Sequence, residues 1–101
     1  MAISAEVSTT GDELTIAVAG RFDFSSHQEF RNAYEALNTA PARYRIDLRE
    51  ANYIDSSALG MLLLLRDYAG GDKAVVEIVN CTSDVRKILS ISNFEQLFTI
   101  H

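Results

Sequence analysis

Two short segments of this 101-residue chain hold the side chains best suited to chemistry. One is Asp55-Ser56-Ser57, and the other is Asp23 with the residues around it, 22–26. Aspartate and serine cap helices, because their oxygens accept hydrogen bonds from free backbone N–H groups. A serine hydroxyl at a helix N-terminus is also exposed, and the N–H groups and helix dipole there favour an anion. Such a position suits a phosphate, which adds roughly −1.5 to −2 charge.

The simplest interpretation of Asp55-Ser56-Ser57 is that these residues cap a helix and do nothing more. One cap needs only one such residue, however, and here two serines follow an aspartate directly. Gly60 fits a partner surface above the same helix, since it leaves the helix without a side chain at that point. Packing inside the protein explains a glycine equally well. Both alternatives stay open on the sequence.

Hydrophobic periodicity predicts the strands that must position these segments. Alternation with a period of two, or a short apolar run, is typical of a strand, and glycine is a common terminator. Strands are expected over residues 3–8, 13–19, 43–48, 74–79 and 97–100, with Gly20 ending the second.

Three segments have the periodicity of helices. The apolar stripe over residues 30–37 predicts the first helix, capped by Ser25 or Ser26. Residues 55–68 are apolar on nearly all sides, which indicates a helix mostly covered by the rest of the protein. A third stripe, over residues 85–89, predicts the last helix.

The order of these elements predicts an α/β fold: a mixed, largely parallel β-sheet of 4-5 strands with helices packed on it. Functional groups in such sheets lie beyond the carboxyl ends of strands. Asp23 follows the second expected strand and Asp55 follows the third. The two segments therefore approach each other if those strands are neighbours.

Length and charge exclude several classes of function. The chain has the size of one domain, 1–101, and 48% of its residues are apolar, enough for one modest core. A formal net charge of −5 argues against nucleic acid or an anionic membrane as a partner. The longest apolar run, Met61 to Leu65, is too short to span a bilayer. Cys81 is the only cysteine and no signal peptide is evident, so we expect a cytoplasmic location.

We expect neither an enzyme nor a cofactor or metal site. Hydrolytic chemistry at Ser56 has little support, because no G-x-S-x-G elbow surrounds it. His27 is expected to be an exposed helix residue, and His101 is the only other histidine. One cysteine and two histidines in unrelated segments do not make a metal site.

Residues 53–62, Tyr-Ile-Asp-Ser-Ser-Ala-Leu-Gly-Met-Leu, resemble the phosphorylation-site motif of the STAS domain, in particular that of bacterial anti-sigma factor antagonists. Gly20-Arg21-Phe22-Asp23 is similar to that family's other characteristic turn, and the order of elements is similar over essentially the whole chain. Ala58 departs from the pattern, because many relatives carry glycine there. Both residues are small, so the departure casts little doubt on the site.

This resemblance implies a partner switch controlled by phosphorylation. Ser56, directly after the aspartate, would be phosphorylated by a serine kinase, often the anti-sigma factor itself. The unphosphorylated form would bind the anti-sigma factor and free a sigma factor, and a PP2C-type serine phosphatase would reset the phosphorylated form. Asp55 would orient or support Ser56, while Asp23, Ser57 and Gly60 would support the site or the partner surface.

One alternative stays open within the same family. The chain could be a constitutive STAS adaptor, a small subunit of a transporter or of a signalling assembly, in which Ser56 is only a helix cap. The sequence also leaves open whether Ser57 can replace Ser56.

Overall fold

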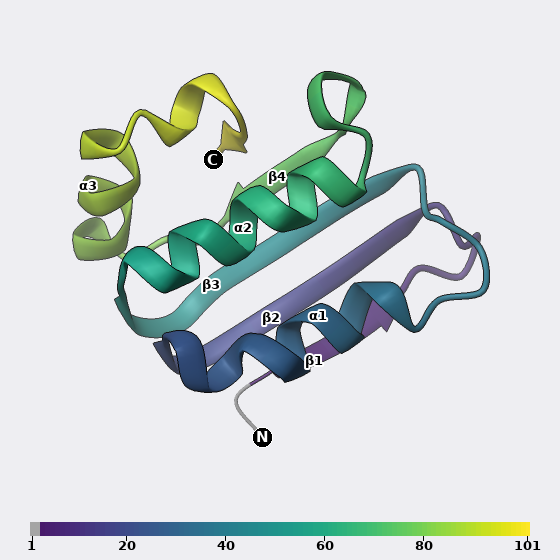
Figure 1. The fold of residues 1–101 in the computed structure, drawn as a ribbon, viewed down its shortest axis with the longest axis horizontal. Helices are drawn as coiled ribbons and strands as arrows, with labels where there is room; N and C mark the ends of the chain where they lie inside the picture. The colour runs from purple at the N-terminus through teal and green to yellow at the C-terminus, as the bar shows by residue number, and fades with distance from the viewer. Residues whose placement is uncertain (1–2) are drawn as a thin grey trace.

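In the computed structural model, which describes residues 3–101, five strands form one sheet in the order β1-β2-β3-β4-β5 (Figure 1). β1 runs antiparallel to β2, and the other neighbouring pairs are parallel. The strands are β1 (Ile3–Val7), β2 (Glu13–Phe22), β3 (Arg43–Ile54), β4 (Val76–Val79) and β5 (Thr99–Ile100). The predicted α/β fold with a mixed, largely parallel sheet is confirmed.

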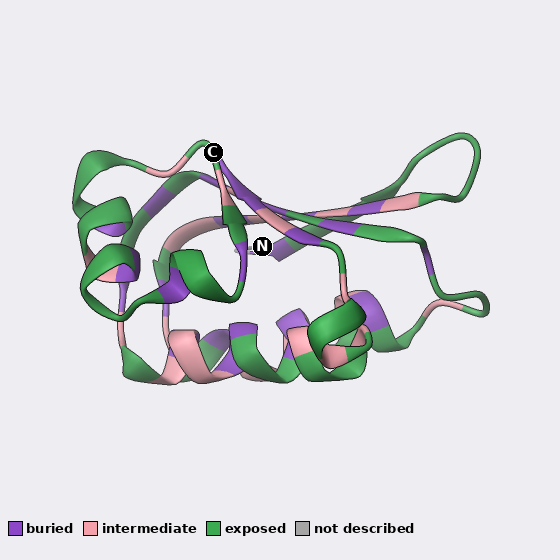
Figure 2. Ribbon diagram, turned by 90° about the horizontal axis from the view of Figure 1, so that it is seen from above, coloured by how far each residue is buried: buried purple, intermediate pink, exposed green. Residues whose placement is uncertain are grey.

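Helices follow β2, β3 and β4 along the chain, as predicted. They are α1 (His27–Glu35), α2 (Ser56–Tyr68) and α3 (Ser83–Ile91), and short 3-10 turns cover Phe24–Ser26, Gly71–Lys73 and Phe94–Gln96. α1 and α2 lie side by side over one face of the sheet, and α3 packs at one end of it (Figures 1 and 2). The face of the sheet turned away from α1 and α2 carries no helix among residues 3–101 (Figure 2).

The core lies between the sheet and the layer of helices. In β2, Leu14, Ile16 and Val18 are buried on this side, while the alternating residues are only partly covered on the open face. Leu14 pairs with Tyr44 of β3, which is also buried. One hydrophobic cluster therefore fixes β2 against β3 and holds both helices above them.

β2 and β3 extend further than the sequence predicts. Gly20 does not end β2. Its backbone takes a left-handed conformation (φ +77°), but the strand continues beyond it to Phe22. The β2–β3 register shifts between Ala17 and Ala19 and again between Gly20 and Arg21. Such irregularities break the period-two pattern, so the pattern predicts shorter strands than the structure has. Because of these additional residues, β2 ends directly before Asp23 and β3 ends directly before Asp55.

α2 is covered on its sheet side, as expected, but its outward face is exposed. Leu62 and Leu65 are fully buried on the sheet side of the helix, but Leu63 and Leu64 are 40% and 55% exposed on the other side. α2 belongs to the outer of two layers, and no element within residues 3–101 lies above its outward face (Figure 2). No helix within residues 3–101 has the length and apolar character needed to cross a membrane.

Candidate functional site

The carboxyl ends of β2 and β3 bring the two aspartate segments together. These strands are parallel neighbours, and Phe22 pairs with Ile54 at the end of the register. Asp23 and Asp55 follow that pair directly, and their carboxylates are close enough to interact electrostatically. The predicted approach of the two segments is therefore confirmed.

Asp55 is the cap of α2. Its Oδ1 accepts hydrogen bonds from the backbone N–H of Ala58 (3.0 Å) and from the hydroxyl of Ser57 (2.6 Å). No hydrogen bond within residues 3–101 involves the Ser56 hydroxyl, and Ser56 is exposed. Asp55 thus holds Ser57 directly, and its support of Ser56 stays a prediction.

The Asp23 segment repeats this arrangement. Asp23 Oδ1 accepts hydrogen bonds from both the backbone N–H (3.0 Å) and the hydroxyl of Ser25. Ser26 occupies the N-cap position of α1, as predicted, but its side chain makes no capping hydrogen bond to that helix. The side-chain cap is instead made by Asp23, at the start of the preceding 3-10 turn. The ionised carboxylate of Asp23 is a stronger hydrogen-bond acceptor than a serine hydroxyl. Asp23 therefore accepts a hydrogen bond from the free backbone N–H of Ser25.

In each of the two turns, the one after β2 and the one after β3, the residue directly after the aspartate is exposed. It is Ser56 in the turn after β3, and Phe24, which is 69% exposed, in the turn after β2. The Phe24 ring stacks on His27 with 5.2 Å between ring centroids. His27 is consequently half-buried, and the expectation that it is exposed is wrong. The site pairs a free hydroxyl with an exposed aromatic ring.

Hydrogen bonding keeps both carboxyl groups ionised. The Ser57 hydroxyl, followed by the Ala58 N–H, lowers the pKa of Asp55, while burial and the charge of Asp23 act in the opposite direction. The Ser25 hydroxyl and N–H lower the pKa of Asp23, with a smaller contribution from Arg21. At neutral pH the two aspartates are therefore fixed negative charges that accept hydrogen bonds.

Ser56 shares an outward stripe of α2 with Gly60, Leu63, Leu64 and Asp67, which follow it at helical spacing. Apart from its own helix backbone, a Cβ atom added at Gly60 would meet no atom of residues 3–101 within 4 Å. Packing among the described residues therefore does not explain Gly60, and its place in a partner surface stays a prediction. The surface beside Ser56 is flat at Gly60 and apolar at the two leucines, as a partner surface would be.

Sequence reasoning missed the roles of Arg21 and Phe24. The Arg21 guanidinium lies 4.1 Å from the centre of the Tyr53 ring, and its Nε donates a hydrogen bond to Asp23 Oδ2 (3.2 Å). The available signal was the spacing of Arg21 and Asp23, since residues i and i+2 of a strand lie on one face. The contact with Tyr53 depends on the irregular strand register, which the sequence does not reveal.

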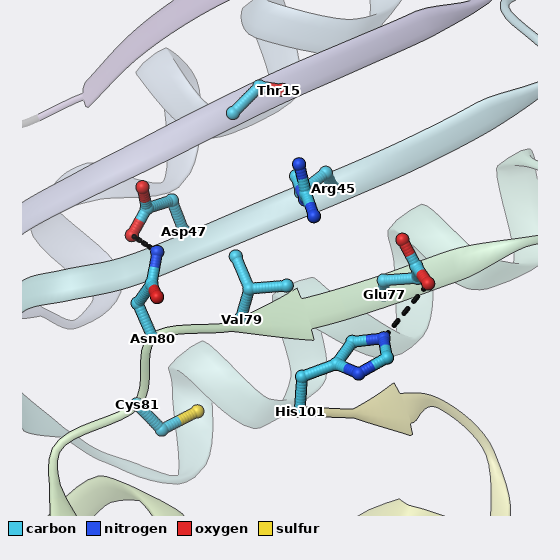
Figure 3. A pocket seen from close by; sticks show the side chains of 8 residues that line it. All are labelled: Thr15, Arg45, Asp47, Glu77, Val79, Asn80, Cys81 and His101. Carbon is cyan, nitrogen blue, oxygen red and sulfur yellow. Dashed lines mark hydrogen bonds and ion pairs between the residues drawn. The ribbon is translucent and has the colours of Figure 1, made fainter.

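A shallow pocket of about 520 Å³ lies away from this site, on the open face of the sheet (Figure 3). Its polar side chains largely pair with one another: Asn80 donates to Asp47 (3.2 Å), and His101 contacts Glu77 (2.9 Å). Burial raises the pKa of the Cys81 thiol, which keeps it protonated and unreactive. Residues 3–101 contain no group of His, Cys, Asp and Glu side chains arranged to hold a metal ion.

Comparison with known proteins identifies the family of this chain. A family model described as "Mlab, STAS domain" matches residues 5–99. A STAS-domain containing protein of Pseudomonas aeruginosa (strain UCBPP-PA14) is 63% identical over 100 residues, covering 99% of each chain.

Two solved structures show the same fold. The anti-sigma factor antagonist SpoIIAA in its unphosphorylated form superposes with a TM-score of 0.71 at 19% identity, over 99% of this chain and 87% of that one. The STAS domain of a SulP transporter from Vibrio cholerae superposes with a TM-score of 0.63 at 18% identity, over 82% of this chain and 69% of that one. The chain therefore belongs to the STAS-domain family, whose fold is found in anti-sigma factor antagonists and in transporter domains alike.

Proposed function

We propose that this chain is an anti-sigma factor antagonist that works as a phosphorylation-controlled partner switch, with Ser56 as the phosphorylated residue. One observation carries the proposal: Ser56 is exposed at the start of α2, and no hydrogen bond within residues 3–101 holds its hydroxyl. The hydroxyls of Ser57 and Ser25 are bound to the carboxylates of Asp55 and Asp23. A kinase would therefore find the Ser56 hydroxyl free, and the other two occupied.

A phosphate on Ser56 would change this surface without needing a change of fold. The start of α2 favours an anion, because its first N–H groups point outward. The phosphate adds roughly −1.5 to −2 charge next to the carboxylates of Asp55 and Asp23. A partner that covers the neutral form would have to bury this concentrated negative charge, which is strongly unfavourable without compensating cations.

The partner surface in this proposal surrounds Ser56. It comprises the exposed apolar side chains of the two turns and of α2, namely Phe24, Tyr53, Leu63 and Leu64. In the unphosphorylated form it would bind an anti-sigma factor or serine kinase, so that a sigma factor is freed. A PP2C-type serine phosphatase would restore this form after phosphorylation. The structural likeness to the antagonist SpoIIAA supports this assignment at the level of the fold.

The second candidate is a constitutive adaptor for a transporter or a signalling assembly. The exposed stripe of α2 favours it, since a permanent partner could cover Leu63 and Leu64 without any phosphate. In that case Ser56 would be only a helix cap. The capping hydrogen bond to α2 is made by Asp55, however, so Ser56 is left without that role.

Phosphosite mapping separates these functions. The protein would be purified from its native cells as wild type and as the variants Ser56→Ala and Ser57→Ala, and digested for mass spectrometry. We expect one phosphate, on Ser56, in the wild type and in Ser57→Ala, and none in Ser56→Ala. Phosphate on Ser57 would overturn the choice of residue. Stable recovery with a membrane transporter, with Ser56 never modified, would favour the adaptor.

A further inference from the structure

Arg21 occupies an unusual position at the carboxyl end of β2. Its guanidinium crosses to the neighbouring strand and lies over the ring of Tyr53, 4.1 Å from the centroid, while Nε donates to Asp23 (3.2 Å). The side chain is nevertheless 65% exposed. The aromatic ring and the carboxylate together hold a cation at the edge of the site that contains Ser56.

Most of the hydrogen-bonding capacity of Arg21 is unused. A guanidinium has five N–H donors, of which only the one on Nε finds a partner within residues 3–101. Both terminal nitrogens are thus available for a second acceptor. Arginine commonly binds phosphate through two parallel hydrogen bonds. Arg21 is also the only lysine or arginine in the two segments that form the site, residues 20–26 and 53–58.

The strand register limits how far Ser56 can lie from this cation. Arg21 pairs in register with Tyr53, and Ser56 follows Tyr53 by three residues, at most about 10 Å along the chain. The guanidinium already extends toward the carboxyl end of the strands, where it contacts Asp23. An arginine side chain and a phosphoserine side chain can together close the remaining distance.

We propose that Arg21 is the phosphate-binding residue of the switch, and that it exchanges Asp23 for the phosphate when Ser56 is phosphorylated. This inference rests on the proposed function of Ser56. The exchange is favourable because a phosphate near −2 attracts the guanidinium more strongly than the single charge of Asp23 does. It leaves Asp23 without its cation and alters the covering of Tyr53. Phosphorylation would therefore rearrange the partner surface as well as add charge to it.

The test uses the full chain with phosphoserine installed at position 56 by genetic code expansion, so that no kinase is needed. The second pKa of the phosphate, normally about 6, is measured by 31P NMR. Contact with Arg21 stabilises the dianion, so we expect Arg21→Gln to raise this pKa by about half a unit, as for an exposed ion pair. Arg21→Lys, which keeps the charge, should recover part of the difference.

A matched control is Arg31→Gln. Arg31 is also an exposed arginine paired with a carboxylate, Glu35 at 2.8 Å, but it lies on α1 and outside the two turns. This variant should leave the phosphate pKa unchanged. The Tyr53 ring signals should move on phosphorylation in the wild type and stay fixed in Arg21→Gln. Equal phosphate pKa values in the wild type and Arg21→Gln, or an equal rise in Arg31→Gln, would overturn the proposal.

The two proposals fail in different measurements. If cells never phosphorylate Ser56, the proposed function is lost, and phosphosite mapping shows it directly. If the titration shows no dependence on Arg21, only the phosphate contact is lost, because the phosphate in that experiment does not come from a cellular kinase.

Discussion

At the scale of single residues, the turn that begins at Asp23 and the turn that begins at Asp55 differ in the residue directly after the aspartate. Asp23 and Asp55 each hold the serine two positions further along, through the same carboxylate oxygen that accepts a backbone N–H. The residue between is an exposed phenylalanine in one turn and an exposed serine in the other. The same local geometry therefore presents an apolar contact on β2 and a modifiable hydroxyl on β3.

The Asp55 cap should make stability depend on pH. The Ser57 hydroxyl and the Ala58 N–H lower the pKa of Asp55 in the folded protein. Its contribution is therefore fully present above the unfolded pKa, about 3.9, and is lost as the pH falls through the lower folded value. Asn caps helices as well as Asp does, so Asp55→Asn should fold normally at pH 7 and lose less stability towards pH 3.

Urea unfolding midpoints at pH 7, 4 and 3 would measure this difference. Asp67→Asn is a suitable control, because it removes an exposed carboxylate of α2 that lies far from the cap. It should lose stability towards acid as the wild type does. Parallel acid slopes for wild type and Asp55→Asn would show that this cap contributes nothing through its charge.

The sequence predicted that the Asp23 and Asp55 segments approach each other if their strands are neighbours, but it did not reveal their contacts. The local pattern alone did not distinguish Ser56 from Ser57, and the choice of Ser56 rests on the resemblance to the STAS motif. The roles of Arg21 and Phe24 depend on which residues face each other across β2 and β3. Two register shifts decide that pairing, and no local pattern in the sequence reveals them. The sequence likewise has three capping residues within four positions, Asp23, Ser25 and Ser26, and does not show which side chain makes the capping hydrogen bond.

At the level of secondary-structure elements, α2 is the part of the fold with two separate tasks. Its inner face, including Leu62 and Leu65, completes the core, and its outer face carries Ser56 together with exposed leucines. The sequence predicted the helix correctly but not the exposure of its outer face. A helix that is apolar on nearly all sides is usually buried, but no further layer within residues 3–101 covers the outer face of α2 (Figure 2).

Leu64→Glu tests the outer face of α2. Leu64 is 55% exposed, so its replacement should change the free energy of unfolding by no more than about 0.5 kcal/mol. Partner recovery from cell extracts should fall sharply, because a charge would enter an apolar contact. Leu62→Ala is the contrasting variant: it empties a fully buried position and should cost about 2–5 kcal/mol. Unchanged partner recovery with Leu64→Glu would remove this face from the interface.

Gly60→Ala separates stability from binding. Beyond its own helix backbone, a Cβ at this position would meet no described atom within 4 Å, and alanine is the better helix former. The variant should therefore stabilise the protein by about 0.5–1 kcal/mol, measured by thermal or urea unfolding. If a partner approaches the helix closely beside Ser56, the same methyl group should weaken binding. A gain in stability with unchanged partner binding would mean that Gly60 serves no interface.

For the molecule as a whole, the parallel pairing of β2 with β3 makes the site possible. It places two turns that are about thirty residues apart in sequence at one edge of a single sheet. The alternation of strands and helices predicted this arrangement, because parallel strands need a helical crossover between them. The site lies outside the core, so a modification there can act without unfolding the domain.

Ser56→Asp should accordingly leave the fold intact. Ser56 is exposed and its hydroxyl holds no other described residue, so the free energy of unfolding should change by about 0.5 kcal/mol or less. This corresponds to a shift in Tm of at most about 4 °C. A larger loss, measured by differential scanning calorimetry, would indicate that a negative charge at this position disturbs α2 itself.

Partner recovery by wild type, Ser56→Ala and Ser56→Asp tests the proposed switch most directly. Each tagged variant is expressed in the native cells at equal level, and the proteins recovered with it are quantified by mass spectrometry, with Ser57→Ala as the matched control. We expect one principal partner to be retained by Ser56→Ala and Ser57→Ala and to be lost by Ser56→Asp, with phosphate on Ser56 of the wild type. Recovery of the same partner in equal amount by Ser56→Asp, with no phosphate on Ser56, would contradict the switch.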